Sequence, residues 1–173
     1  MSAPFGIEFY TPISALADSQ EVGQGHYMVT PPKPHPMFEG YIVRATPSLG
    51  IVWIKAMTPT IANDKFGAAT RGQVDRLAEQ LTQKYGRGAK TDLLLAGSIW
   101  TDPQDWTSGL CERERFYNVV WEAPAVRLPD NLEHIFVGAT PVDGYDVMVV
   151  VEYSSRRLGE ADAEMERGMA DLL

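Results

Sequence analysis

The pattern of apolar and polar positions repeats one arrangement twice along the chain. Residues 41–55 and residues 135–151 each contain two runs of apolar, mostly β-forming side chains, joined by Ala-Thr-Pro-x-x-Gly. Proline early in a turn and glycine at its end favour a tight reversal, so each segment is predicted to be a β-hairpin. A duplicated module would explain the repeat. The alternative is that two ordinary hairpins share a turn sequence by chance.

Other runs of β-forming residues predict additional strands. His26–Thr30 favours a short strand, and Phe38–Thr46 favours the first strand of the first hairpin, which returns as Ile51–Ile54. Arg115–Glu122 is rich in aromatic and β-branched residues. The second hairpin extends to Tyr153. The four prolines between residues 31 and 36 exclude a central strand there and favour an extended linker.

Helices are predicted from apolar spacing and from capping residues. A helix from Arg71 has apolar side chains at helical spacing and ends at Gly86, since glycine commonly terminates helices. Thr11-Pro12 and Asp102-Pro103 each combine a capping residue with proline at the first helical position. The predicted helices are residues 11–20, residues 71–86, a segment that starts at Asp102 and a segment that starts at about Arg156.

This order of elements predicts an α+β fold. It is written as α-β-β-β-α twice, and strands joined by short turns form antiparallel sheets. We therefore expect a single domain, residues 1–173, with a twisted antiparallel sheet of about six strands and helices mainly on one face. Its two similar halves would span about residues 1–90 and 91–173.

The charge of the chain is unevenly distributed. Of its 173 residues, 45% are hydrophobic and 22% charged, which is typical of a globular domain, and its net charge is −8. Residues 1–90 hold 9 basic and 7 acidic side chains (net +2), whereas residues 91–173 hold 6 and 16 (net −10). Such an acidic half disfavours nucleic-acid binding and attracts a basic partner. The alternative is an acidic face that only aids solubility.

Cysteine usage and hydropathy indicate a compartment. Cys111 is the single cysteine of the sequence, so an intrachain disulfide is impossible. The start of the sequence lacks the basic and apolar regions of a signal peptide, and no run approaches the roughly 18 apolar residues that span a bilayer. We expect a cytoplasmic protein with no membrane partner.

The sequence carries no motif for phosphate binding or covalent catalysis. It has neither Gly-x-Gly-x-x-Gly nor Gly-x-Ser-x-Gly, and its glycine-bearing segment 85–90 follows a helix instead of preceding one. The three histidines, at positions 26, 35 and 134, are not spaced as metal ligands. We therefore expect no cofactor, no metal and no catalytic residues.

Two groups of residues keep an enzymatic alternative open. Cys111 is flanked by arginines, which lower a thiol pKa, and by glutamates, which raise it. Asp102 and Asp105 share one helical turn and offer a pair of carboxylates for acid–base chemistry. Helix capping and solvated charge explain these carboxylates without catalysis.

The segment of most unusual composition is Gly97–Trp106, which holds two of the four tryptophans among acidic residues. Tryptophan beside carboxylates is typical of a binding hot spot for a cationic group. The alternative is that these rings belong to the core. The candidate partner-binding residues are Asp102, Asp105, Trp106, Glu112 and Glu114.

The same segment carries a resemblance to other proteins. It reads Gly-Ser-Ile-Trp-x-Asp-Pro-x-Asp-Trp, follows Leu49-Gly50-Ile51 and Lys84-Tyr85-Gly86, and precedes Glu114-Arg115. In these residues, across about 40–122, the chain resembles a group of uncharacterised bacterial proteins, which implies no activity and no functional residues. The repeated layout is also similar to duplicated inhibitor folds such as the β-lactamase inhibitory protein, which implies an architecture only.

The expected function is non-enzymatic binding of a basic protein. The duplicated sheet, the acidic second half and the missing catalytic motifs predict an acidic module that neutralises its partner, foremost an immunity protein for a bacterial toxin. The alternatives are a phage-encoded inhibitor of a host defence complex, an enzyme with an unrecognised site, and a self-assembling subunit. Both a monomer and a homodimer remain open.

Overall fold

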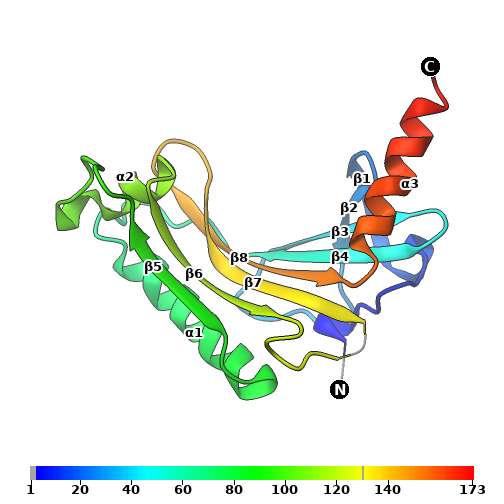
Figure 1. Ribbon diagram of the computed structural model, residues 1–173, viewed down its shortest axis with the longest axis horizontal. Helices are drawn as coiled ribbons and strands as arrows, with labels where there is room; N and C mark the ends of the chain where they lie inside the picture. The colour runs from blue at the N-terminus through cyan, green and yellow to red at the C-terminus, as the bar shows by residue number, and fades with distance from the viewer. Residues whose placement is uncertain (1–2, 130) are drawn as a thin grey trace. The chain divides into compact units, whose positions relative to one another are not determined.

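A computed structural model describes residues 3–129 and 131–173, and it has an α+β fold with one antiparallel sheet of eight strands (Figure 1). The strands are β1 (Ala17–Gly23), β2 (His26–Thr30), β3 (Gly40–Thr46), β4 (Gly50–Met57), β5 (Ala89–Leu94), β6 (Arg115–Glu122), β7 (Leu132–Pro141) and β8 (Val147–Ser155). The α-helices are α1 (Ala68–Tyr85), α2 (Trp106–Cys111) and α3 (Leu158–Ala170). Short 3₁₀ turns cover Pro4–Gly6, Ile13–Ala15 and Pro103–Asp105.

The strand order of the sheet is β1-β2-β3-β4-β8-β7-β6-β5. Each half of the sequence therefore contributes four consecutive neighbouring strands, and each half then continues into a helix, α1 or α3. The two predicted hairpins are β3–β4 and β7–β8, the third and fourth strands of their halves. The α+β class, the antiparallel sheet and both hairpins are confirmed.

The prediction of about six strands in the order α-β-β-β-α is wrong at both ends of the sheet. The missing strands are β1 and β5, which lie at its two edges. Every residue of β1 is exposed, and β5 is exposed except for a half-buried Leu94. An edge strand without a buried face shows no alternation of apolar and polar residues, so the hydrophobic pattern could not reveal it.

Two predicted helix starts form much shorter elements. The helix expected over residues 11–20 is only a 3₁₀ turn at Ile13–Ala15, because Leu16 adopts extended backbone and the chain enters β1 at Ala17. At Asp102-Pro103 the chain also forms a 3₁₀ turn, and the α-helix begins only at Trp106. The helix predicted from Arg71 is confirmed as α1, which ends at Tyr85 before Gly86.

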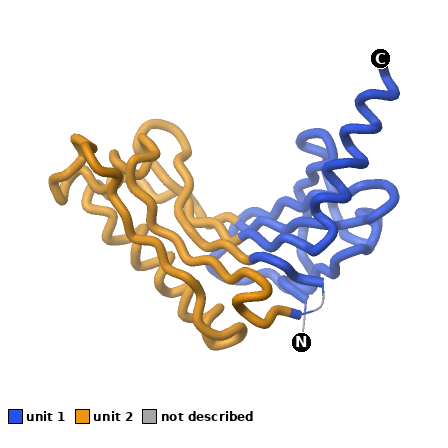
Figure 2. The backbone as a smooth tube through the Cα atoms, viewed as in Figure 1, with its two compact units in different colours: residues 1–56, 129–134, 152–173 blue, residues 57–128, 135–151 orange. Residues whose placement is uncertain are grey.

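The chain divides into two compact units, coloured separately in Figure 2. Unit 1 contains residues 1–56, 129–134 and 152–173, and unit 2 contains residues 57–128 and 135–151. Helix α1 comes from the first half of the sequence but packs on β6, a strand of the second half, in unit 2. Helix α3 comes from the second half but packs on β3, a strand of the first half, in unit 1. The helices are thus exchanged between the two sequence halves.

Unit 1 has a core between its strands and α3. Leu49, Val52 and Ala161 are buried together, and Tyr10 and Leu158 pack against them. A second group of apolar contacts is aromatic. In it the ring of Phe5 meets those of Phe38, Tyr41 and Tyr153 edge-on, at centroid distances of 5.7, 5.0 and 5.8 Å.

Unit 2 has its core between α1 and the strands. Val74, Leu77 and Leu81 form the buried face of α1. Trp121 of β6 is fully buried, and its indole Nε1–H donates a 2.7 Å hydrogen bond to the carbonyl of Gly86 at the end of α1. This bond satisfies both a buried donor and a helix-terminal acceptor, which fixes α1 along the sheet.

Candidate functional site

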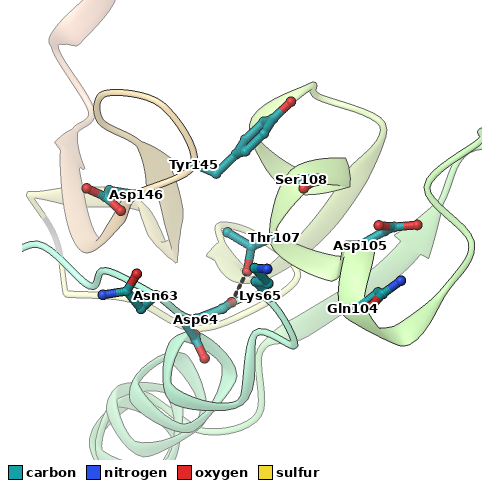
Figure 3. A pocket seen from close by; sticks show the side chains of 9 residues that line it. All are labelled: Asn63, Asp64, Lys65, Gln104, Asp105, Thr107, Ser108, Tyr145 and Asp146. Carbon is teal, nitrogen blue, oxygen red and sulfur yellow. Dashed lines mark hydrogen bonds between the residues drawn. The ribbon is translucent and has the colours of Figure 1, made fainter.

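The candidate site is a polar pocket of about 430 Å³ in unit 2 (Figure 3). Three segments surround it: the loop between β4 and α1, the turn and helix over residues 103–111, and the turn between β7 and β8. Its lining residues are Asn63, Asp64, Lys65, Gln104, Asp105, Thr107, Ser108, Tyr145 and Asp146.

Asp64 fixes the first of these segments to the start of α1. Its carboxylate accepts 2.8 Å hydrogen bonds from the backbone N–H and the side-chain hydroxyl of Thr70, and a 3.2 Å bond from the N–H of Ala69. Partial burial acts to raise the pKa of Asp64, but these bonds together lower it below its usual value. Asp64 is therefore a charged helix cap and a weak base.

A second set of bonds joins this loop to α2. The hydroxyl of Thr107 donates to the backbone carbonyl of Asp64, shown as a dashed line in Figure 3, and the N–H of Thr107 donates to the carbonyl of Lys65 over 3.2 Å. Ile61 exchanges two backbone hydrogen bonds, of 2.7 and 3.1 Å, with Val147 at the start of β8. The walls of the pocket are thus held by backbone contacts.

Trp106 is buried at the start of α2, between the pocket residues Asp105 and Thr107 in the sequence. Its ring is 5% exposed, meets Tyr117 edge-on at 5.7 Å, and lies against the guanidinium groups of Arg71 and Arg115, whose Cζ atoms are 5.1 and 5.6 Å from the ring centroid. The cations stack on its π faces as a cation–π pair requires. The structure therefore places Trp106 in the core. The sequence predicted it as a partner-binding residue, but its ring is not on the surface.

The third wall, the β7–β8 turn, presents an exposed aromatic side chain instead. The turn is closed by a 2.9 Å bond from the N–H of Val142 to the carbonyl of Asp146. Tyr145 is 50% exposed, its ring lies 6.4 Å from that of Trp100, and its hydroxyl donates to Glu112 Oε1 over 3.2 Å. This hydrogen bond from the neutral phenol is the main cause of the raised pKa of Tyr145.

The predicted acidic residues are distributed unequally around this pocket. Asp105 is half-buried and lines it, and Glu112 is exposed and reaches it through Tyr145. Asp102 is exposed one residue before the 3₁₀ turn and makes no side-chain capping bond. Glu114 is half-buried, and its backbone bonds to Leu95 and Gly109.

Sequence reasoning missed two of the three aspartates of the pocket, Asp64 and Asp146. Neither lies in a recognisable motif. A signal was present for Asp146 only, since it lies two residues after Gly144, where the repeated hairpin turn ends. Three aspartates, Asp64, Asp105 and Asp146, and one lysine, Lys65, line the pocket, and the carboxylate of Asp64 points toward the start of α1 (Figure 3). The balance of charge in the pocket therefore favours a cationic occupant.

Cys111, the single cysteine of the sequence, is poorly suited to nucleophilic chemistry. Cys111 is half-buried at the end of α2. Burial raises the pKa of its thiol, and the charges of Glu112 and Asp146 raise it further. A thiol with a raised pKa is protonated at neutral pH and hence a weak nucleophile.

The described part of the chain also lacks two features that would indicate other functions. Within residues 3–129 and 131–173, no group of three or more His, Cys, Asp or Glu side chains is arranged to hold a metal ion. Among the same residues, no helix combines the length and the apolar character needed to cross a membrane.

Comparisons with protein-family models, with curated proteins and with solved structures find no match to this chain. The resemblance to bacterial proteins of unknown activity, and the architectural likeness to duplicated inhibitors, therefore stay predictions.

Proposed function

We propose that this protein is a non-enzymatic binding module that neutralises a basic partner protein, as an immunity protein does for a bacterial toxin. The observation that carries this proposal is the pocket of unit 2, which is open, lined by residues with polar or charged side chains, and contains more aspartates than lysines. A lysine or arginine side chain of a partner matches it in size and charge.

Exposed apolar side chains in the segments around the pocket support a protein as the occupant. Phe66, next to Lys65, is 57% exposed, Tyr145 is 50% exposed, and Ile99, next to Trp100, is 77% exposed. Protein interfaces combine apolar contacts with a few buried charged groups that fix orientation. A small cationic metabolite would leave these side chains in water.

The acidic surroundings would also affect how fast a partner binds. Asp102, Glu112 and Asp143 are exposed in the segments that form or flank the pocket. Carboxylates gathered at one site steer a basic protein toward it and raise the association rate, most strongly at low ionic strength. We therefore propose that these acidic residues speed the association with a basic partner, in addition to aiding solubility.

The proposal includes an internal duplication. Both halves run through four strands into a helix, and their fourth strands are neighbours in the sheet. The first hairpin turn also lines a pocket, of about 280 Å³ in unit 1, and the second lines the acidic pocket of unit 2. A duplication followed by divergence of one pocket accounts for both features.

The alternatives make different demands on the same residues. A phage-encoded inhibitor would use the same acidic surface, so the identity of the partner distinguishes it from an immunity protein. An enzyme would need a reactive group in the pocket, but the thiol of Cys111 has a raised pKa and the carboxylate of Asp64 is committed to α1.

The test is quantitative affinity capture from the source cell with two matched variants. The wild type should retain one basic protein in stoichiometric amount. The variant with Asp105→Asn and Asp146→Asn should retain at least about tenfold less, because two carboxylates of the pocket lose their charge. The control, Glu166→Gln with Asp171→Asn, removes the same charge from an exposed position of α3 and from the exposed residue that follows it, and should bind as the wild type does.

Two results would reject the proposal. One is equal loss of the partner in both variants, which would mean that only total charge matters. The other is turnover of a metabolite by the purified protein that the pocket variant abolishes and the α3 control leaves intact.

A further inference from the structure

The two edges of the sheet differ in regularity. At one edge, the pairing of β1 with β2 shifts register twice, between Ala17 and Gln20 and between Glu21 and Gly23. At the other edge, β5 pairs with β6 through six consecutive residue pairs without a shift. Bulges protect an edge strand from pairing with another chain, and a regular edge lacks this protection.

Among residues 3–129 and 131–173, β5 ends the strand order, so one side of its backbone faces no further strand. The N–H of Leu95 donates to the carbonyl of Glu114 over 2.7 Å, in register with the β5–β6 pairs. Antiparallel strands alternate their hydrogen-bonding direction, so Leu93, Thr91 and Ala89 also point their backbone groups at β6. Those of Lys90, Asp92 and Leu94 point away from β6, at the end of the strand order.

We propose that two copies of this chain pair antiparallel through β5, about a two-fold axis at Thr91. In this register Lys90 of each copy lies directly opposite Asp92 of the other. The outward backbone groups of these two residues then form the ladder bonds. The Lys90 ammonium bonds to the Tyr117 hydroxyl and lies 3.6 Å from Asp75 in its own chain, but its side chain is half exposed, so Asp92 of the other copy adds a second carboxylate beside it, and this contact occurs twice. Opposite charges on facing residues stabilise a sheet.

Charge complementarity selects this register over its neighbours. With the axis at Asp92, two aspartates would face each other directly, which is destabilising. With the axis at Leu93, Asp92 would face Leu94, and Lys90 would face Ala96. The segment Lys90-Thr91-Asp92 is therefore self-complementary: in an antiparallel pair of two copies, each lysine faces an aspartate.

Side chains on the opposite face of β5 favour the same pairing. Leu93 is 49% exposed and lies in register beside Phe116, which is 37% exposed. In the proposed register Leu93 faces Ala89 of the second copy. The small alanine leaves room for the leucine, so pairing covers apolar surface that the single chain exposes to water.

Sedimentation or light scattering across a dilution series tests this proposal. The wild type should reach twice the 19.2 kDa mass of the chain at high concentration. Asp92→Pro should stay monomeric, because it removes an outward N–H and leaves the β5–β6 ladder intact. Asp92→Lys should weaken dimerisation by about tenfold or more, because it sets like charges opposite each other twice.

A mixing experiment separates loss of pairing from loss of folding. Asp92→Lys alone and Lys90→Asp alone should each dimerise at least about tenfold more weakly than the wild type, and their equimolar mixture should form a heterodimer in which every facing pair is again opposite in charge. Asp171→Lys, which makes the same charge change just after the end of α3, should dimerise as the wild type does. A monomeric wild type, a dimer that persists in Asp92→Pro, or a mixture that stays monomeric would each overturn the proposal.

Discussion

At the residue scale, the pocket depends on how tightly the backbone approaches Trp106. Gly67 sits at the N-terminus of α1 with φ of +69°, a conformation that L side chains rarely adopt. A Cβ atom added there would lie 2.0 Å from the indole ring. Only glycine therefore allows the loop before α1 to pass over the ring and reach Thr107.

Replacing Gly67 by alanine should destabilise the protein by about 3 kcal/mol, because the left-handed backbone and the clash with Trp106 add together. The matched control is Gly72→Ala in the same helix, where a new Cβ meets nothing within 4 Å. That change should stabilise by about 0.5–1 kcal/mol. Urea unfolding measures both, and equal effects would contradict this account of the loop.

Asp64→Ala should cost about 1–2 kcal/mol at neutral pH, because the first turn of α1 loses its charged acceptor. The folded pKa of Asp64 lies below its ordinary value of 3.8, so its contribution is present above about pH 4 and is lost as the pH falls through the folded pKa. Urea unfolding of wild type and variant at a series of pH values should show the gap narrowing in acid. A gap that widens in acid would refute this role.

The sequence could predict only part of the site at this scale. Asp105 and Glu112 were identified because acids beside tryptophans form a local pattern. Asp64 could not be found in this way, since it reaches the pocket through a bond between its carbonyl and Thr107, 43 positions away. The sequence pattern singled out Trp106 as a candidate binding residue. Its burial between Arg71 and Arg115 depends on contacts with distant residues, which no local pattern contains.

At the element scale, the attachment of α1 to the sheet includes a polar contact. The hydroxyl of Tyr117 in β6 donates a 2.6 Å hydrogen bond to Asp75 of α1, and Lys90 of β5 donates a 3.0 Å bond to the same hydroxyl. Burial is the main cause of the raised pKa of Tyr117, and Asp75 adds to it. The phenol is therefore a protonated donor that joins one helix to two strands.

Tyr117→Phe should destabilise the protein by about 1 kcal/mol, since Asp75 loses its donor and the ring keeps its packing. The control is Tyr145→Phe, whose hydroxyl bonds to Glu112 at an exposed position, and it should change stability by less than about 0.5 kcal/mol. Thermal unfolding of both variants checks this. A larger loss in Tyr145→Phe would show that α1 does not depend on the contact.

The elements that sequence reasoning found and missed differ in burial. Helix α1, β6 and both hairpins were predicted because each buries a face, which leaves a periodic apolar pattern. The edge strands β1 and β5 bury almost nothing and are stabilised by ladder bonds to β2 and β6. Backbone hydrogen bonds do not depend on which side chains a strand carries, so such strands show no apolar pattern in the sequence.

At the scale of the whole molecule, the exchange of helices makes the two sequence halves depend on each other. Helix α1 is encoded in the first half and packs in unit 2, and α3 is encoded in the second half and packs in unit 1. Each half alone would therefore expose the strand surface that the other half covers. Local hydrophobic patterns predict the helices but do not show which strands they cover.

Fragments 1–87 and 88–173 should each fail to fold alone and should form a native-like complex when mixed. The reason is that each fragment lacks the helix that completes its own strands. Near-ultraviolet circular dichroism and size-exclusion chromatography measure the recovery of packing. Cooperative folding of the fragment 1–87 by itself would contradict the exchange.

The central claim is that the acidic pocket of unit 2 receives a cationic group from a partner protein. The most direct measurement is crosslinking in the source cell with a photoreactive amino acid in place of Ser108, which lines the pocket, and in place of the exposed Glu79 of α1. One basic protein should be crosslinked at position 108 and should be absent at position 79. No product at position 108, or the same products at both positions, would contradict it.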